Sequence, residues 1–312
     1  MRTILITGGT GLIGHSLVKQ LTGKNYRVII LTRSLKNKVA DERTEYALWD
    51  PAGGTIDAEA VRRADGIIHL AGAGVMDKKW TQAYKKEILE SRSKSTALLI
   101  QSLQSDVHRV KVLVSASATG WYGPDRIPGH FFTEEEPADT AFLGEVCRQW
   151  EESTVPAEAM GIRVCRLRTG IVLDREGGAY AAFRAPLKFG LATILATGKQ
   201  VVSWIHIDDL CRQYIFALEN ENMRGSYNAV APEPVTNKTL TLTIAKVVRG
   251  KFYLPVHVPG FILKIMMGGR SVEILKSVTA SCEKIKQQGF TYFYPGIGAA
   301  VRAIEKKMTD DR

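Results

Sequence analysis

The chain has 312 residues, of which 45% are hydrophobic and 24% charged, as in a globular protein with one large domain or a large and a small domain sharing a core. No apolar run approaches the roughly 20 residues of a membrane-spanning helix, and the N-terminus lacks a signal-peptide layout, so we expect a cytoplasmic protein with no membrane partner. The net charge of +10 suits anionic ligands or a solvated basic surface, and without a recognition motif it predicts no nucleic-acid partner.

The first fifteen residues combine a strand, a glycine turn and a helix. Thr3–Thr7 is a short β-branched run typical of a strand buried on both faces, and apolar residues recur at helical spacing from Leu12. Gly8 allows a tight turn, Gly11 lets the backbone approach a pyrophosphate, and Gly14 lets the helix pack on the strand. The helix N-terminus offers N–H groups to a phosphate. The pattern predicts a dinucleotide site, and the alternative is a glycine-rich loop without a ligand.

The second expected strand, Arg27–Leu31, is followed by Thr32, Arg33 and Ser34. In a dinucleotide fold an acidic residue at this place accepts from the 2′-hydroxyl of NAD, whereas an arginine pairs with the 2′-phosphate of NADP. Arg33 stands in place of the acid, with a hydroxyl on either side, so the predicted cofactor is NADP. The alternative is an ordinary surface arginine in a loop.

Three further strands are expected over Tyr46–Asp50, Gly66–Ala71 and Lys111–Ser115, with helical segments between them. Strands that alternate with helices form a parallel sheet with right-handed crossovers, so the predicted fold is α/β, a doubly wound Rossmann-type sheet. Ligands of such sheets bind beyond the carboxyl ends of the strands. The segments expected at that edge are 8–14, 32–34, 70–72 and 115–123.

Six segments, TGGTGLIG, LTRS, HLAG, SASATGWYG, RLRTGIVL and SWIHIDDL, occur in the order found in the extended short-chain dehydrogenase/reductases. The chain resembles the atypical branch of that group, NAD(P)-dependent epimerase-family proteins similar to nucleoside-diphosphate-sugar epimerases, including the branch's C-terminal segment. The resemblance implies an NADP-binding Rossmann domain over residues 1–231, with substrate-side insertions after 173, and a smaller α/β substrate-side region over 232–312. The cofactor-binding residues predicted from motifs and resemblance together are Gly8, Thr10, Gly11, Leu12, Ile13, Gly14, Thr32, Arg33, Ser34, Leu70, Ala71, Gly72, Glu87, Arg92, Ser115 and Val172.

The extended enzymes use a serine or threonine after the fifth strand and a Tyr-x-x-x-Lys pair on the next helix. The lysine lowers the tyrosine pKa, and the tyrosine exchanges a proton with the substrate as hydride moves. Ser117 matches the serine, but Phe142 lies near the expected tyrosine, and none of the ten tyrosines has a lysine four residues on. The predicted catalytic residues are Ser117, to hydrogen-bond a substrate oxygen, and Tyr122, to donate a proton. Tyr122 is equally compatible with an aromatic plug in a turn.

Two functions are therefore carried forward. One is an NADP-dependent oxidoreductase or isomerase that acts on a small molecule, possibly a nucleotide sugar, as an epimerase, dehydratase or reductase. The other is a non-catalytic NADP(H) binder that serves as a redox sensor or scaffold. The four scattered cysteines have neither metal-ligand nor redox spacing, so we expect reduced thiols and no metal site. A monomer or a homodimer is expected.

Overall fold

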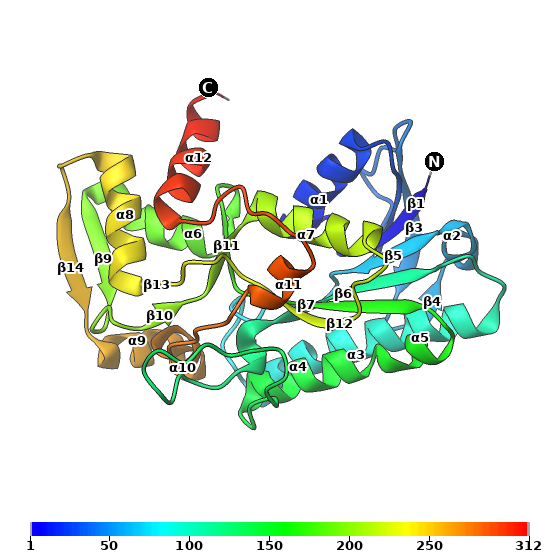
Figure 1. Ribbon diagram of the computed structural model, residues 1–312, viewed down its shortest axis with the longest axis horizontal. Coiled ribbons are helices and arrows are strands. Elements are labelled where there is room, and N and C mark those ends of the chain that lie inside the picture. The colour runs from blue at the N-terminus through cyan, green and yellow to red at the C-terminus, as the bar shows by residue number, and fades with distance from the viewer. Residues whose placement is uncertain (1, 311–312) are drawn as a thin grey trace. The chain divides into compact units, whose positions relative to one another are not determined.

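The computed structural model describes residues 2–310, except for the side chains of residues 307–310. The chain forms two compact units, which we describe separately (Figure 1). Unit 1 comprises residues 1–121, 138–168 and 211–227, and unit 2 comprises residues 122–137, 169–210 and 228–312. The sequence predicts a Rossmann domain up to residue 231 followed by a C-terminal region, and that order of two domains along the chain stays a prediction.

The elements of unit 1 are β1 (Thr3–Thr7), α1 (Leu12–Gly23), β2 (Arg27–Thr32), β3 (Thr44–Asp50), β4 (Thr55–Ile56), α2 (Ala58–Arg63), β5 (Gly66–His69), α3 (Gln82–Ser105), β6 (Val112–Ala118), η1 (Thr119–Trp121), α4 (Phe142–Glu152), α5 (Val155–Ala159), β7 (Arg163–Thr169), α7 (Ile207–Glu219) and β12 (Gly225–Ala229). Three of them, β7, α7 and β12, also include residues of unit 2.

An eight-stranded sheet organises unit 1, in the order β12-β7-β6-β5-β1-β2-β3-β4. β1 pairs in parallel with β2 on one side and β5 on the other, and β2–β3 and β5–β6 are also parallel, whereas β3–β4 is antiparallel. Every residue of β1 and β5 is buried, as expected for central strands covered on both faces. Helices α1 and α7 cover one face, and α3 and α4 cover the other (Figure 1). The predicted Rossmann-type α/β fold is confirmed.

Unit 2 is built from short strands and helices. Its elements are β8 (Ile171–Asp174), α6 (Gly178–Arg184), η2 (Ala185–Phe189), β9 (Leu191–Leu195), β10 (Val201–Val202), β11 (Trp204–His206), β13 (Val235–Thr236), α8 (Asn237–Arg249), β14 (Leu254–Val258), α9 (Gly260–Met267), η3 (Gly268–Arg270), α10 (Ser271–Leu275), α11 (Glu283–Gln287) and α12 (Ile297–Asp310). The strands pair two by two, as β8–β11, β9–β14 and β10–β13. The core includes Trp204 and Tyr180, packed with apolar residues of α8 and α12.

Two expected elements differ from the structure. The segment 162–172 is expected from the sequence to form one strand, but the chain forms β7 and β8 with a break at Gly170, where a Cβ would lie 2.5 Å from the Ser203 carbonyl oxygen. The segment 272–288 predicts one helical stretch, but α10 and α11 are separated by an extended segment in which Val278 and Ala280 form isolated β-bridges. Backbone contacts with distant residues override the local sequence pattern in both places.

Within residues 2–310, no helix is both long and apolar enough to cross a bilayer. The four cysteines are free and buried, which agrees with the expected reduced thiols.

Candidate functional site

The glycine turn between β1 and α1 is shaped by close backbone packing. Gly8 has a φ of +67°, and a Cβ there would lie 3.0 Å from the Leu70 carbonyl carbon at the end of β5. At Gly14 a Cβ would lie 2.3 Å from the Gly8 carbonyl oxygen, so no other residue fits without moving the backbone. These two glycines have the turn and packing roles that the sequence predicts.

Gly11 differs from Gly8 and Gly14 because the space beside it is open. A Cβ at Gly11 would meet only the Gly8 carbonyl oxygen, at 3.4 Å, and its φ of −83° suits any residue. Gly11 is the N-cap of α1, and no acidic residue lies in the first turn. Thr10 and Gly11 are exposed, and Leu12 and Ile13 are half-buried. The helix therefore presents its first-turn N–H groups to accessible space, as an anion site requires.

A buried threonine connects β1 with the turn after β5. The Oγ1 atom of Thr7 accepts hydrogen bonds from the backbone N–H groups of Leu70 and Ala71, both at 3.1 Å. Since those bonds occupy its acceptor side, the Thr7 hydroxyl donates to Nδ1 of His69, at 2.7 Å. Thr7 thereby holds the Leu70–Gly72 backbone beside the glycine turn.

His69 extends this network to α3. The Thr96 hydroxyl donates to the Arg92 carbonyl oxygen, so it accepts from Nε2–H of His69, at 3.1 Å. His69 is fully buried, and burial, with the nearby Arg92 charge, lowers its pKa to about 3. A neutral imidazole with its proton on Nε2 therefore ties together β1, β5 and α3. The sequence analysis did not identify His69, although a polar residue at the end of a buried strand was the available signal.

Arg92 is a buried cation without a carboxylate partner among the described residues. Its side chain is 8% exposed, its Nη1 donates to the Ile88 carbonyl oxygen at 2.8 Å, and its Cζ lies 4.8 Å from the centre of the Trp150 ring. A Cβ at Gly72 would lie 3.1 Å from the guanidinium carbon, so Arg92 lies against the turn after β5. Burial lowers the pKa of Arg92. Since a buried charge is costly unless it is paired, this arrangement favours an anionic or strongly polar ligand.

Arg33 lies on the loop after β2 and is exposed. Its guanidinium forms no ion pair with any acidic side chain that the structure describes. Beside it, the Thr32 hydroxyl donates to the Ser34 carbonyl oxygen at 3.0 Å, which shapes the turn. The loop can therefore present a free guanidinium to a phosphate.

Three other predicted cofactor residues lie in different settings. Glu87 on α3 forms an exposed ion pair with Lys78, at 3.2 Å. Ser115 on β6 is buried, and its hydroxyl donates to the Ala116 carbonyl oxygen. Val172 lies on β8 of unit 2. Their roles stay predictions.

Ser117 belongs to a buried ionic cluster in unit 1. Its hydroxyl donates to Oε1 of Glu151 at 2.7 Å, and the side chain is 3% exposed. Arg168 donates through Nε and Nη2 to the two oxygens of Glu151, at 2.8 and 3.0 Å, and Ser226 donates to Oε2 at 2.7 Å. Glu151 and Arg168 escaped the sequence analysis because they are far apart in the chain and carry no motif.

Tyr122 lies in unit 2 and is 1% exposed. Its hydroxyl donates to Oδ1 of Asn228 at 2.7 Å, and its ring stacks on Phe132 with 4.9 Å between ring centres. This setting matches the aromatic plug that the sequence offered as the alternative role. It also places the two predicted catalytic side chains in different units.

Helix α4 occupies the place of the helix that carries Tyr-x-x-x-Lys in the extended enzymes. It begins at Phe142, and the residue four positions on is the buried Val146. Burial raises the pKa of Cys147 on the same helix to about 12, so its thiol stays protonated and unreactive. The buried side of α4 therefore supplies no proton relay of the usual kind.

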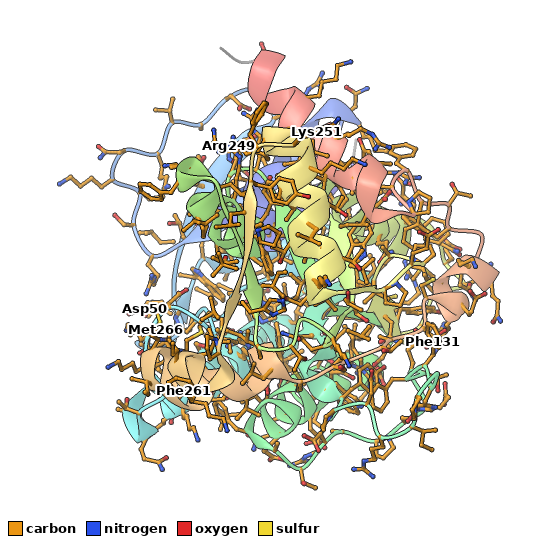
Figure 2. All side chains as sticks on the ribbon, turned by 90° about the vertical axis from the view of Figure 1, so that its left-hand side faces the viewer. Asp50, Phe131, Arg249, Lys251, Phe261 and Met266 are labelled. Carbon is orange, nitrogen blue, oxygen red and sulfur yellow. The ribbon has the colours of Figure 1, made fainter. Side chains whose placement is uncertain are left out.

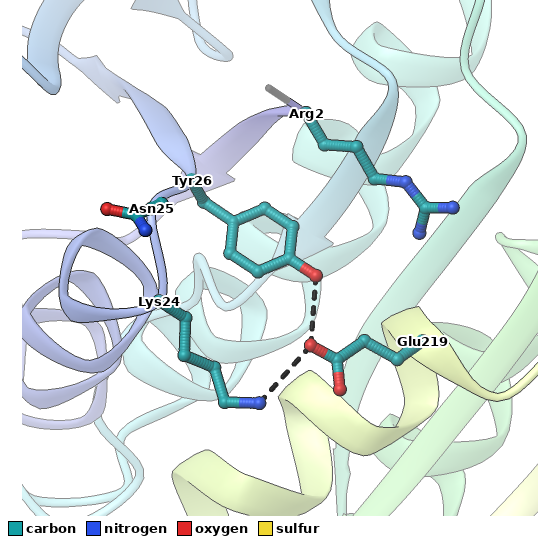
Figure 3. Close-up of a pocket in the computed structure, with 5 residues that line it drawn as sticks. All are labelled: Arg2, Lys24, Asn25, Tyr26 and Glu219. Atoms are coloured by element: carbon teal, nitrogen blue, oxygen red, sulfur yellow. Dashed lines mark hydrogen bonds and ion pairs between the residues drawn. The ribbon is translucent and has the colours of Figure 1, made fainter.

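A shallow hollow of about 350 Å³ lies at the other end of the sheet, where Arg2 and Tyr26 precede β1 and β2 (Figure 3). There the Glu219 carboxylate already accepts from the Tyr26 hydroxyl at 2.9 Å and from Lys24 Nζ at 3.3 Å. In parallel α/β sheets ligands bind at the carboxyl ends of the strands. The hollow is therefore not the candidate site, and the polar groups at the carboxyl end are.

Comparisons with known proteins agree with this geometry. Residues 4–230 match the NAD dependent epimerase/dehydratase family, and residues 258–304 match a domain of unknown function, DUF1731. The Epimerase family protein SH2119 of Staphylococcus haemolyticus is 34% identical over 96% of this chain and 98% of its own length.

Two solved structures extend the comparison. The human epimerase family protein SDR39U1, crystallised with NADPH, is 26% identical, with a TM-score of 0.82 over 97% of this chain and 99% of that one. A nucleoside-diphosphate sugar epimerase from Corynebacterium glutamicum is 31% identical, with a TM-score of 0.75 over 96% of this chain and 57% of that one. The fold, the glycine turn and these similarities together show that the chain belongs to the NAD dependent epimerase/dehydratase family.

Proposed function

We propose that this protein binds NADP(H) at the carboxyl end of the unit 1 sheet and uses it as an oxidoreductase or epimerase on a polar carbonyl or nucleotide-sugar substrate. The observation that carries the proposal is a set of hydrogen-bond donors at that end that have no acidic partner among the described residues. They are the first-turn N–H groups of α1, the exposed guanidinium of Arg33 and the buried guanidinium of Arg92. The NADPH in the crystals of the similar human protein supports NADP(H) over NAD(H).

Each group has a distinct role in this proposal. The N–H groups of Thr10, Leu12 and Ile13 would bind the pyrophosphate, since the Gly11 N–H already donates to the Gly8 carbonyl oxygen at 3.0 Å. Arg33, with the hydroxyls beside it, would bind the 2′-phosphate. Arg92 would donate to a phosphate or ribose oxygen next to the Leu70–Gly72 turn. Bound NADPH would supply a hydride for a reduction, whereas bound NADP⁺ would accept a hydride and return it in an epimerisation, and the chain's part is to bind and orient the cofactor.

The substrate class rests on the relatives. The Corynebacterium glutamicum protein, 31% identical to this chain, is named a nucleoside-diphosphate sugar epimerase, which supports a nucleotide sugar. Ser117 and Tyr122 are the proposed groups for hydrogen-bonding and protonating the substrate. Both hydroxyls already donate to buried acceptors, so each must exchange its partner to act in catalysis.

The hydrogen bonds that the Ser117 and Tyr122 hydroxyls already make favour a second candidate, an NADP(H) binder without turnover. A hydroxyl held by a buried carboxylate, and a tyrosine held by a buried amide, have stabilising roles without any substrate. The absence of a Tyr-x-x-x-Lys pair from the sequence also fits this candidate.

Cofactor binding can be tested at Gly11, where the structure separates binding from folding. We expect Gly11→Val to fold normally, since its Cβ meets only one atom, and to lose NADPH binding because the side chain fills the space before the α1 amides. Gly23→Val is the matched control, because Gly23 ends the same helix with nothing within 4 Å of its Cβ position. Fluorescence titration with NADPH and thermal unfolding measure both properties. Unchanged NADPH affinity in Gly11→Val would refute the site.

Turnover separates the two candidates. Purified protein with NADPH or NADP⁺ would be screened against nucleotide sugars and small ketones by nicotinamide absorbance, and by sugar analysis for epimerisation without net redox change. Turnover that falls in Ser117→Ala or Tyr122→Phe would support the catalytic proposal. Tight NADPH binding with no turnover on any substrate would favour the non-catalytic binder.

A further inference from the structure

The net positive charge of this chain arises largely from two stretches of unit 2 that contain no acidic residue. Residues 177–207 contain three Lys and Arg residues, residues 234–272 contain six, and neither stretch contains Asp or Glu. Arg184 pairs with Glu305, and Arg270 has contacts of its own. The other seven cations have no carboxylate within ion-pair distance among the described residues. Cofactor binding in unit 1 does not account for this charge.

The two stretches meet where η2 and α8 end. The Arg249 guanidinium donates to the Lys188 carbonyl oxygen at 3.3 Å, and the Leu254 N–H donates to the Gly190 carbonyl oxygen at 2.8 Å. Gly190 and Gly250, with φ of +74° and +64°, end the helices in tight turns. The result is one surface, the basic aromatic patch, formed by Lys188, Phe189, Arg249, Lys251, Phe252 and Leu254.

The apolar side chains of this patch face solvent almost completely. Phe189 is 83% exposed, Phe252 is 85% exposed and Leu254 is 62% exposed. Figure 2 faces β14, with Arg249 and Lys251 near one end of the strand and Phe261 and Met266 of α9, both 65% exposed, near the other. Exposed apolar side chains gathered on one surface and rimmed by polar or charged groups mark an interaction site.

We propose that the basic aromatic patch binds the surface of an anionic phospholipid bilayer. Lipid phosphates would pair with Lys188, Arg249 and Lys251, and the two phenylalanine rings would enter the headgroup region. The contact is peripheral, in accord with the lack of a spanning helix among the described residues. It revises the expectation from the sequence that there is no membrane partner, and it is independent of the proposed cofactor chemistry.

Charge argues against a second copy of this chain as the occupant. A two-fold contact through the patch would bring the same three cations of each copy face to face without an acid between them. An anionic bilayer instead offers negative charge to the cations and an apolar layer to the rings.

Flotation with vesicles tests the proposal. The full chain would be mixed with vesicles of phosphatidylcholine alone, or with roughly one third phosphatidylglycerol, at low and high salt. We expect binding only to the anionic vesicles, and weaker binding in high salt. The variants are Lys188→Glu/Lys251→Glu for charge, Phe189→Ser/Phe252→Ser for the rings, and Val107→Ser/Lys111→Glu in unit 1 as the matched control.

The charge variant should bind anionic vesicles about tenfold more weakly or worse, and the ring variant should also bind more weakly. The control should bind like the wild type, and all variants should keep their NADPH affinity and melting temperature. No binding of the wild-type chain to anionic vesicles at low salt would overturn the proposal. Equal losses in the control would also overturn it, and so would a dimer in light scattering that only the ring variant abolishes.

Discussion

Two buried arginines of unit 1 have similar packing and different electrostatic partners. Arg92 on α3 is 8% exposed and lies over Trp150, and Arg168 on β7 is 3% exposed and lies over Trp121. Arg168 forms two hydrogen bonds with the buried carboxylate of Glu151. Arg92 hydrogen-bonds one backbone carbonyl and faces no carboxylate that the structure describes.

Because of this difference, the two arginines have different roles. The Arg168 charge is neutralised by the protein itself, so its role is structural, and Ser117 belongs to the same cluster. The Arg92 charge has no carboxylate partner among the described residues. Its desolvation cost is therefore not offset until a ligand supplies an anionic or polar partner. Burial of a charged group alone does not mark a binding site, and the absence of a partner is the informative property.

The largest expected effect is a loss of stability on breaking the buried ion pair between Arg168 and Glu151. Arg168→Met leaves Glu151 buried without its partner and should lower the free energy of unfolding by about 3–5 kcal/mol. Urea denaturation measures this loss. Arg168→Met with Glu151→Leu should recover part of it, because no charge is then left buried. A single variant as stable as wild type would show that the pair contributes nothing.

Arg92→Met sharpens the contrast. Because Arg92 has no carboxylate partner among the described residues, its removal should leave the free energy of unfolding unchanged or raised. The same variant should bind NADPH about 10- to 100-fold more weakly, since a charge-assisted hydrogen bond is lost. Urea denaturation and NADPH titration separate the two effects. If stability fell as far as in Arg168→Met, the two arginines would have the same structural role.

The pH dependence of stability reports on His69, beside Arg92. Its pKa is about 3 in the folded protein, against an ordinary value of 6.5, so the folded protein holds the neutral form. The stability that His69 contributes is present above pH 6.5 and falls toward pH 3, by about 1.4 kcal/mol per pH unit at most. Between pH 6.5 and about 4, the free energy of unfolding of His69→Gln should depend less steeply on pH than that of the wild type. His130→Gln serves as the control, and equal slopes for wild type and His69→Gln would contradict the buried neutral imidazole.

The smallest effect concerns cofactor preference. Arg33→Ser should weaken NADPH binding by about five- to tenfold and leave NADH binding unchanged, because an exposed ion pair with phosphate is partly screened. Arg27→Ser, an exposed arginine at the opposite end of the same strand, should change neither affinity. An unaltered ratio of NADPH to NADH affinity in Arg33→Ser would place the 2′-phosphate elsewhere.

The sequence was most informative where a pattern is local. The strand Thr3–Thr7, the glycine turn and the start of the helix at Leu12 agree with the sequence prediction, because a buried β-branched run and helical periodicity are both readable along the chain. The break at Gly170 was not predicted, because the backbone that packs against Gly170 belongs to Ser203, 33 positions away.

The sequence by itself determined the Rossmann-type sheet and the glycine turn, since those follow from neighbouring residues and their periodicity, and its motifs carried the resemblance to the family. Only the tertiary structure decided that Ser117 donates to Glu151, that Thr7, bonded to His69, holds the turn after β5, and that Arg92 lacks, among the described residues, the partner that Arg168 has. Burial and pairing depend on residues brought together from distant parts of the chain, and no local pattern encodes which charge is left unsatisfied.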